Sequence, residues 1–285
     1  MQARKVSQVV QATAVTEGAG VTVHRTIGTP ARRHFDPFLM LDHFSSDDPN
    51  DYIAGFPDHP HRGFITFTYM LDGHMLHQDS MGNRSDLNAG GVQWMKAASG
   101  VIHSEMPQQR DGLMRGFQLW INLPAQEKMS DPGYQEFTPQ AIPEVQGNGL
   151  RVRVLSGEYA GHTGPISDPH TQVQYLDVNL AAKQVFTQPV NAALNAFVYV
   201  FEGDARLGDA PLPQHGLALL GPGDSVSVTA GDQGARFILV AGRPLHEPIV
   251  QYGPFVMTTR ADIERAMQDY QQGKLVQKKA VMAGT

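Results

Sequence analysis

Hydrophobic residues recur along the chain in short runs, and within most runs they alternate with polar residues. A period of two places side chains on opposite faces of a β-strand, so each run predicts a strand. Gly and Pro, 29 and 19 of the 285 residues, separate the runs along the whole sequence. Short strands between turn residues are typical of an all-β sandwich or barrel. The clearest runs are VTVHRTI, GFITFTYML, GFQLWINL, LRVRVLSG, QYLDVNL, NAFVYVF and ARFILVAG.

One segment near the C-terminus predicts an α-helix. Thr259 and Asp262 have the spacing of a helix-capping pattern, and Gly273 would end the helix. A stripe of apolar residues would form its buried face. That stripe comprises Ile263, Met267 and Tyr270.

The two halves of the chain share a sequence pattern. Residues 67–73 read F-x-Y-x-x-acid-G, and residues 197–203, 130 positions later, read the same. The turn at Gly90-Gly91 before VQWM is echoed by Pro222-Gly223 before SVSV. A repeat of this kind predicts two β-domains of one architecture.

We expect the domains to divide the chain in sequence order. The N-terminal domain would comprise residues 1–135 and the C-terminal domain residues 136–285, ending in the helix. The polar, Pro-rich segment 127–149 is the predicted linker.

Composition narrows the classes of function. Lys and Arg total 22 against 28 Asp and Glu, a net charge of -6, which gives no electrostatic basis for direct binding of nucleic acid or an anionic membrane. No run of about 18 apolar residues occurs, and the N-terminus lacks the apolar core of a signal peptide, so we expect a cytoplasmic protein. The chain has no cysteine, so any metal must be bound by histidines and carboxylates.

Two pairs of residues have the spacing of metal ligands on strands. His59 and His61 are two positions apart, and so are His103 and Glu105. Residues i and i+2 of a strand point to one face, so two such pairs on neighbouring strands would form a cluster of three histidines and one carboxylate. An isolated H-x-H pair is ordinary in a chain with 12 histidines, and only the second pair favours a metal site.

Other residues near these pairs have open interpretations. His74 and His77 either line the site or lie in a solvated loop. Asp58 and Arg62 either orient an imidazole or form surface ion pairs. A further set either lines an apolar slot for a substrate or belongs to the barrel core. This set comprises Phe56, Phe64, Trp94 and Met95.

The spacing of the two pairs resembles the cupin superfamily. Its first motif, G-x5-H-x-H-x3,4-E-x6-G, matches from His59 to Gly73, except that Thr66 stands at the position of the glutamate. Its second motif, G-x-x-H, matches Gly100 to His103, and a carboxylate follows at Glu105.

That displaced glutamate resembles the pirin family, as do further segments in order along nearly the whole chain. They are DPFLMLDHF, FPDHPHRGF, QWM, HSEMP, QLWINL, SGE and GPFVM. Gly91, where pirins often have aspartate, and KAASG depart from the family pattern. The resemblance implies two tandem cupin jelly-roll β-barrels with a C-terminal α-helix.

The same resemblance implies that the N-terminal barrel binds a divalent metal, usually iron, through His59, His61, His103 and Glu105. It also implies a C-terminal barrel without a site. The sequence supports this difference, because a shift by the repeat places Pro189 and Asn191 opposite the two histidines and puts no His or Glu opposite the second pair. Nitrogen and oxygen ligands alone do not choose among Fe(II), Mn, Co, Ni, Cu and Zn.

The resemblance further implies quercetin 2,3-dioxygenase activity, in which a flavonol is cleaved with O2 and carbon monoxide is released. The substrates would be a planar aromatic molecule and O2, and Glu105 would be both ligand and general base. Two alternatives stay open. The protein would be an iron-dependent regulator that binds a transcription factor or a metabolic enzyme, or an isomerase or storage barrel of the same fold.

Overall fold

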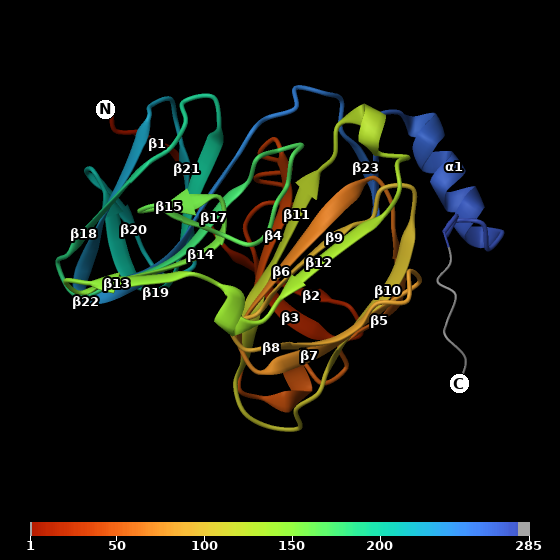
Figure 1. Ribbon diagram of the computed structural model, residues 1–285, viewed down its shortest axis with the longest axis horizontal. Helices are drawn as coiled ribbons and strands as arrows, with labels where there is room; N and C mark the ends of the chain where they lie inside the picture. The colour runs from red at the N-terminus through yellow and green to blue at the C-terminus, as the bar shows by residue number, and fades with distance from the viewer. Residues whose placement is uncertain (1, 279–285) are drawn as a thin grey trace. The chain divides into compact units, whose positions relative to one another are not determined.

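The computed structural model describes residues 2–278, and strands dominate it (Figure 1). Its contacts divide into two compact units. Unit 1 comprises the described residues up to Thr13, Thr26–Pro37 and Gln140–Pro244. Unit 2 comprises Ala14–Arg25, Phe38–Pro139 and the described residues from Leu245.

Unit 2 is built from two antiparallel sheets. The larger sheet has the strand order β12-β9-β6-β11-β4-β3-β2 and the smaller has the order β5-β10-β7-β8. The larger sheet contains β12 (Gly133–Phe137), β9 (Val92–Lys96), β6 (Phe64–Asp72), β11 (Met114–Asn122), β4 (Phe38–Ser46), β3 (Val21–Arg25) and β2 (Thr13–Glu17). The smaller contains β5 (Phe56–His61), β10 (Val101–Pro107), β7 (His74–Asp79) and β8 (Arg84–Asn88).

Unit 1 has a corresponding order of strands, but two of its strands, β19 and β22, are longer than any strand of unit 2. Its main path has the order β1-β21-β19-β22-β17-β14-β13, and β18 and β20 pair with β22 and β19. The path contains β1 (Val6–Gln11), β21 (Gly216–Leu220), β19 (Asn195–Leu207), β22 (Ser225–Gly242), β17 (Gln174–Leu180), β14 (Leu150–Ser156) and β13 (Glu144–Gly147). The others are β18 (Val185–Pro189), β20 (Ala210–Leu212) and the hairpin of β15 (Glu158–Tyr159) and β16 (His162–Thr163). The predicted all-β fold with two barrels is confirmed.

Each end of the chain belongs to the other unit than a division at residue 135 would give. Strand β1 pairs with β21, so the N-terminal strand completes the unit built from the second half of the chain. It takes the place that β12 takes beside β9 in unit 2. The C-terminal helix belongs to unit 2. Sequence order misleads here because strand pairing can join residues far apart in the chain.

The predicted linker at 127–149 is wrong in its extent. It contains η2 in part (Ala125–Glu127), β12, η3 (Pro139–Ala141) and β13. β12 pairs with β9 in unit 2, whereas β13 pairs with β14 in unit 1. Within this segment, the chain passes from unit 2 to unit 1 at the bond after Pro139. A third short helix, η1, spans Pro49–Asp51.

The helix is α1 (Arg260–Gln271), as predicted. Thr259 caps it, because its side chain accepts a hydrogen bond from the backbone N–H of Asp262. The buried face differs from the predicted stripe, since Ile263 and Ala266 are buried and Tyr270 is 42% exposed. The helix packs with the β23–β24 hairpin (Val250–Tyr252 and Phe255–Met257). Among the described residues, no helix has the length and apolarity needed to cross a membrane.

A buried lysine ties the C-terminal segment to the barrel of unit 2. Lys128 Nζ donates to Asn122 Oδ1 at 2.6 Å, to the Gly63 carbonyl at 2.8 Å and to the Val256 carbonyl at 3.1 Å. Burial lowers the pKa of Lys128 to about 7, and the three acceptors match the three N–H groups of its ammonium form.

Replacing Lys128 should therefore destabilise the fold. Lys128→Met leaves buried acceptors without a donor, and we expect the free energy of unfolding to fall by about 1–3 kcal/mol in urea denaturation. Lys274→Met, at an exposed position, is the control. Equal stability of the Lys128→Met variant and the native protein would contradict this account.

Candidate metal centre

The pairing of β5 with β10 brings the two predicted pairs together. The strands are antiparallel, with His103 opposite His59 and Val101 opposite His61. Because alternate side chains share a face, all three histidines point into the barrel of unit 2. The register of this pairing shifts between His103 and Glu105, and such an irregularity changes the direction of the Glu105 side chain relative to the strand.

The three imidazoles lie in contact. The ring centroids of His59 and His103 are 4.4 Å apart, and those of His61 and His103 are 4.8 Å apart. His59 Nε2 and His61 Nε2 are separated by 3.0 Å. One nitrogen from each ring lies within 4.8 Å of the others, close enough for all three to bind one ion.

The electrostatics of the cluster suit a cation. Burial, together with the neighbouring His59, lowers the pKa of His61 well below its usual range. Burial and the adjacent histidines do the same to the pKa of His103. Neutral imidazoles are the form that binds metals. His103 Nε2 is buried and has no hydrogen-bond partner among the described residues, so its lone pair is available to an ion. The side chains present therefore fit a divalent metal ion.

Glu105 lies beside this cluster and is held from the opposite sheet. Its Oε2 accepts a hydrogen bond from Gln118 Nε2 at 2.9 Å, and its Oε1 is 3.2 Å from Thr68 Oγ1. Glu105 groups with His103 and His77, not with all three predicted histidines, at the 4.8 Å spacing. Two groups of potential ligands thus share His103.

His77 is the residue that sequence reasoning left undecided. It lies on β7, opposite Glu105 on β10, and its side chain is only 1% exposed, so the solvated-loop interpretation is wrong for it. Its Nε2 is 3.1 Å from Asp79 Oδ2. His74, by contrast, is half-buried and pairs with Asp86. The signal that distinguishes them is the alternation along β7, which points His77 inward with Met75 and Asp79.

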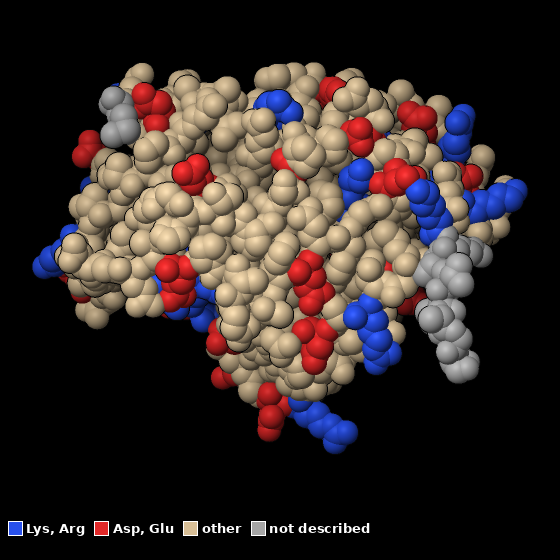
Figure 2. Space-filling model, in the orientation of Figure 1, with Lys and Arg blue, Asp and Glu red and all other residues tan. Residues whose placement is uncertain are grey.

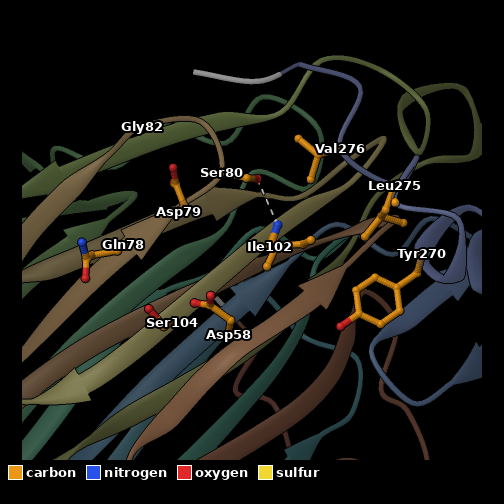
Figure 3. A pocket seen from close by; sticks show the side chains of 11 residues that line it. Asp58, Gln78, Asp79, Ser80, Gly82, Ile102, Ser104, Tyr270, Leu275 and Val276 are labelled. Carbon is orange, nitrogen blue, oxygen red and sulfur yellow. Dashed lines mark hydrogen bonds between the residues drawn. The ribbon is translucent and has the colours of Figure 1, made fainter. Parts of the chain in front are cut away.

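Arg62 and Asp58 do not orient the imidazoles. Arg62 is buried and donates to Ser99 O and to Asp269 Oδ2 of α1, both at 2.7 Å, so it fastens the helix to the end of β5. Asp58 is exposed and points to the outer face of the smaller sheet. It lines a pocket of about 550 Å³ there with Ile102, Ser104 and Tyr270 (Figure 3).

The apolar candidates lie mainly in the core. Phe64 is fully buried with Leu39 and Val256, and Met95 is buried with Val101. Phe56 is half-buried against a neighbouring cluster, and Trp94 is buried. The core interpretation therefore accounts for Phe64 and Met95.

Unit 1 has no comparable cluster among its described residues. The pairing of its strands makes β21 the counterpart of β9, so SVSV on β22 corresponds to β10, not to VQWM. Strands β18 and β22, which pair in unit 1 as β5 and β10 pair in unit 2, contain no histidine and no glutamate.

The surface gives a further view of the charge distribution. Figure 2 shows acidic and basic side chains interspersed on the face drawn, with most of that face formed by other residues.

Two jelly-roll barrels, of which one holds a buried cluster of histidines and glutamate, define a bicupin with one candidate metal centre. The Pirin family model matches residues 20–121, and the model for the Pirin C-terminal cupin domain matches residues 175–276. The chain belongs to the pirin family, and the resemblance seen in the sequence is confirmed.

Individual relatives match nearly the whole chain. A pirin-like protein of Caulobacter vibrioides is 48% identical over 276 residues, covering 96% of this chain and 100% of that protein. A pirin-like protein of Solanum lycopersicum is 46% identical, covering 95% of this chain and 92% of that protein. A crystal structure of quercetin 2,3-dioxygenase from Acinetobacter baumannii has a TM-score of 0.89 at 32% identity, covering 97% of this chain and 99% of that chain.

Removing one imidazole tests the cluster. We expect His61→Ala to lose stoichiometric binding of Ni(II), measured by elemental analysis after dialysis, and to keep the circular dichroism of the native protein, because the apolar core does not depend on the cluster. The exposed His162→Ala is the control. Unchanged nickel content in His61→Ala would contradict a shared site, and unfolding of the metal-free native protein would indicate a structural ion instead.

Proposed function

We propose that this pirin is a metal-dependent dioxygenase that cleaves a flavonol such as quercetin with O2 and releases carbon monoxide. The observation that carries the proposal is the cluster of three imidazoles, two of them buried, beside a buried carboxylate inside one barrel. The likeness to a solved quercetin 2,3-dioxygenase over nearly the full chain supports the same activity.

The proposed ligands are His59, His61, His103 and Glu105, and the proposed ion is Fe(II). A bound divalent ion would supply Lewis acidity that lowers the pKa of a substrate hydroxyl and polarises its oxygen. These four side chains would hold the ion and would leave room for a substrate oxygen on an ion that takes more than four ligands. The barrel carries its own apolar packing, which favours a reactive ion over one that holds the fold together.

Glu105 is the proposed general base. Hydrogen bonds with Gln118 and Thr68 hold both of its oxygens, so the carboxylate has a fixed direction inside the barrel. At that position it would accept the proton of the flavonol hydroxyl, within about 3 Å of the hydroxyl oxygen.

The barrel interior offers partners for a polyhydroxylated aromatic molecule. Thr66 Oγ1 and Gln93 Oε1 are buried and have no hydrogen-bond partner among the described residues. Thr66 lies on β6 with Thr68, and Gln93 lies opposite Thr68 on β9. Buried polar groups of this kind favour a ligand with hydroxyl groups. The corresponding positions in unit 1 are Ala196 and Ala218.

A turnover assay tests the proposal. Protein loaded with Fe(II) without oxygen, then mixed with quercetin and O2, should bleach the flavonol absorbance and release carbon monoxide in equal amounts. Bleaching without carbon monoxide would contradict the proposed cleavage. No turnover with Fe(II), Mn(II), Co(II), Ni(II) or Cu(II), despite stoichiometric loading, would contradict the oxygenase and favour the regulatory alternative.

The role of Glu105 has its own test. Glu105→Gln keeps the shape of the side chain but removes the base, and we expect kcat/KM for quercetin to fall by about 10²–10⁴-fold at equal metal content. Glu264→Gln, at an exposed position of α1, is the control. Turnover by Glu105→Gln at the native rate would show that Glu105 is not the base.

A further inference from the structure

We propose that His77 and Asp79 form a hydrogen-bonded chain that sets the tautomer and orientation of His103 at the metal centre. His77 is thereby a positioning residue, not a ligand. The inference rests on the metal site of the proposed function, but it does not depend on which reaction that site catalyses.

The chain follows from the pairing of β7 with β10. That pairing places Asp79 opposite His103 and His77 opposite Glu105. His77 Nε2 lies 3.1 Å from Asp79 Oδ2, and His77 Nδ1 lies 3.5 Å from His103 Nδ1. Hydrogen-bond contacts thus connect the side chains in the order Asp79, His77, His103, and all three side chains are buried.

Asp79 is fixed by the turn that follows it. Its Oδ1 accepts hydrogen bonds from the backbone N–H groups of Met81 at 2.9 Å and Asn83 at 3.0 Å. Its Oδ2 accepts one from Asn83 Nδ2 at 2.8 Å. A carboxylate surrounded by donors acts as an acceptor, so the His77 Nε2 that faces it is the donor. In Figure 3, Asp79 lies on the strand beside Ser80, whose side chain accepts from the Ile102 N–H at the next strand.

The positions of the protons then follow along the chain. A His103 whose Nε2 binds a cation carries its own proton on Nδ1, and this N–H requires an acceptor. His77 Nδ1 is that acceptor, because the His77 proton is on Nε2 facing Asp79. Consistent with this assignment, His103 Nε2 is the ring nitrogen without a hydrogen-bond partner among the described residues.

Two further observations support a dedicated role. Tyr134 packs on the His77 ring with centroids 5.1 Å apart, and its hydroxyl is held by Ser85 and Gln93, so the ring has a fixed orientation. In unit 1, the part of β19 that pairs with β22 as β7 pairs with β10 contains no histidine. The barrel without the histidine cluster therefore also lacks this chain.

Metal affinity tests the inference without any turnover. The full chain and its variants are titrated with Co(II) against a chelator of known affinity. We expect His77→Leu to bind one Co(II) per chain about 10–100-fold more weakly than the native protein. His77→Gln should recover most of the affinity, because its amide oxygen can accept the His103 N–H. His74→Leu, on the same strand but paired with Asp86 at the surface, should bind like the native protein.

The following results for the His77 variants would overturn the inference. Native affinity in His77→Leu would show that the chain does not act on His103, and equal weakness of His77→Leu and His77→Gln would show a packing effect. Complete loss of binding in His77→Leu would make His77 a ligand. If the His77→Leu variant does not fold, Asp79→Asn is titrated instead. We expect its Co(II) affinity to be several-fold lower than that of the native protein, and native affinity would contradict the inference. Failure of the native protein to bind Co(II) would remove the metal site itself, whereas metal binding without quercetin turnover would leave this inference standing.

Discussion

The antiparallel pairing of β5 with β10 is the constraint on which the candidate metal centre depends. A shift of one residue would turn every side chain of a strand to its other face and would separate the three histidines. The observed register places His103 opposite His59, and the pairing of β10 with β7 adds His77 from the other side. Arg62 holds the end of β5 through α1, so the C-terminal helix supports the strand that carries two of the proposed ligands.

Comparison of the two barrels separates what the fold needs from what the site needs. Both units share one strand order, yet the interior of unit 1 is filled by an aliphatic cluster that includes Val198 and Leu239. Unit 2 has Thr68 and Gln118 at the matching positions, and these residues hold Glu105. The fold therefore forms without the polar interior, and buried polar groups kept at a cost in desolvation favour a function for the interior of unit 2.

The sequence predicts the strands, the helix and the two pairs of candidate ligand residues, because each depends on a short local period. It does not predict that β1 completes unit 1, because that pairing joins Val6 to Leu220 across most of the chain. The sequence also leaves His77 undecided, since His74 and His77 on β7 are three positions apart and lack the i, i+2 spacing of the two pairs, and the place of His77 depends on contacts with β10. For Arg62 the sequence leaves open an imidazole partner or a surface ion pair, whereas the side chain is buried and its partner is Asp269, more than two hundred positions away.

X-ray absorption spectroscopy of the iron-loaded protein tests most directly whether the three histidines share one ion. The account predicts the scattering pattern of three imidazoles together with oxygen ligands on a single iron. A spectrum with oxygen ligands alone, or with only one imidazole, would contradict it.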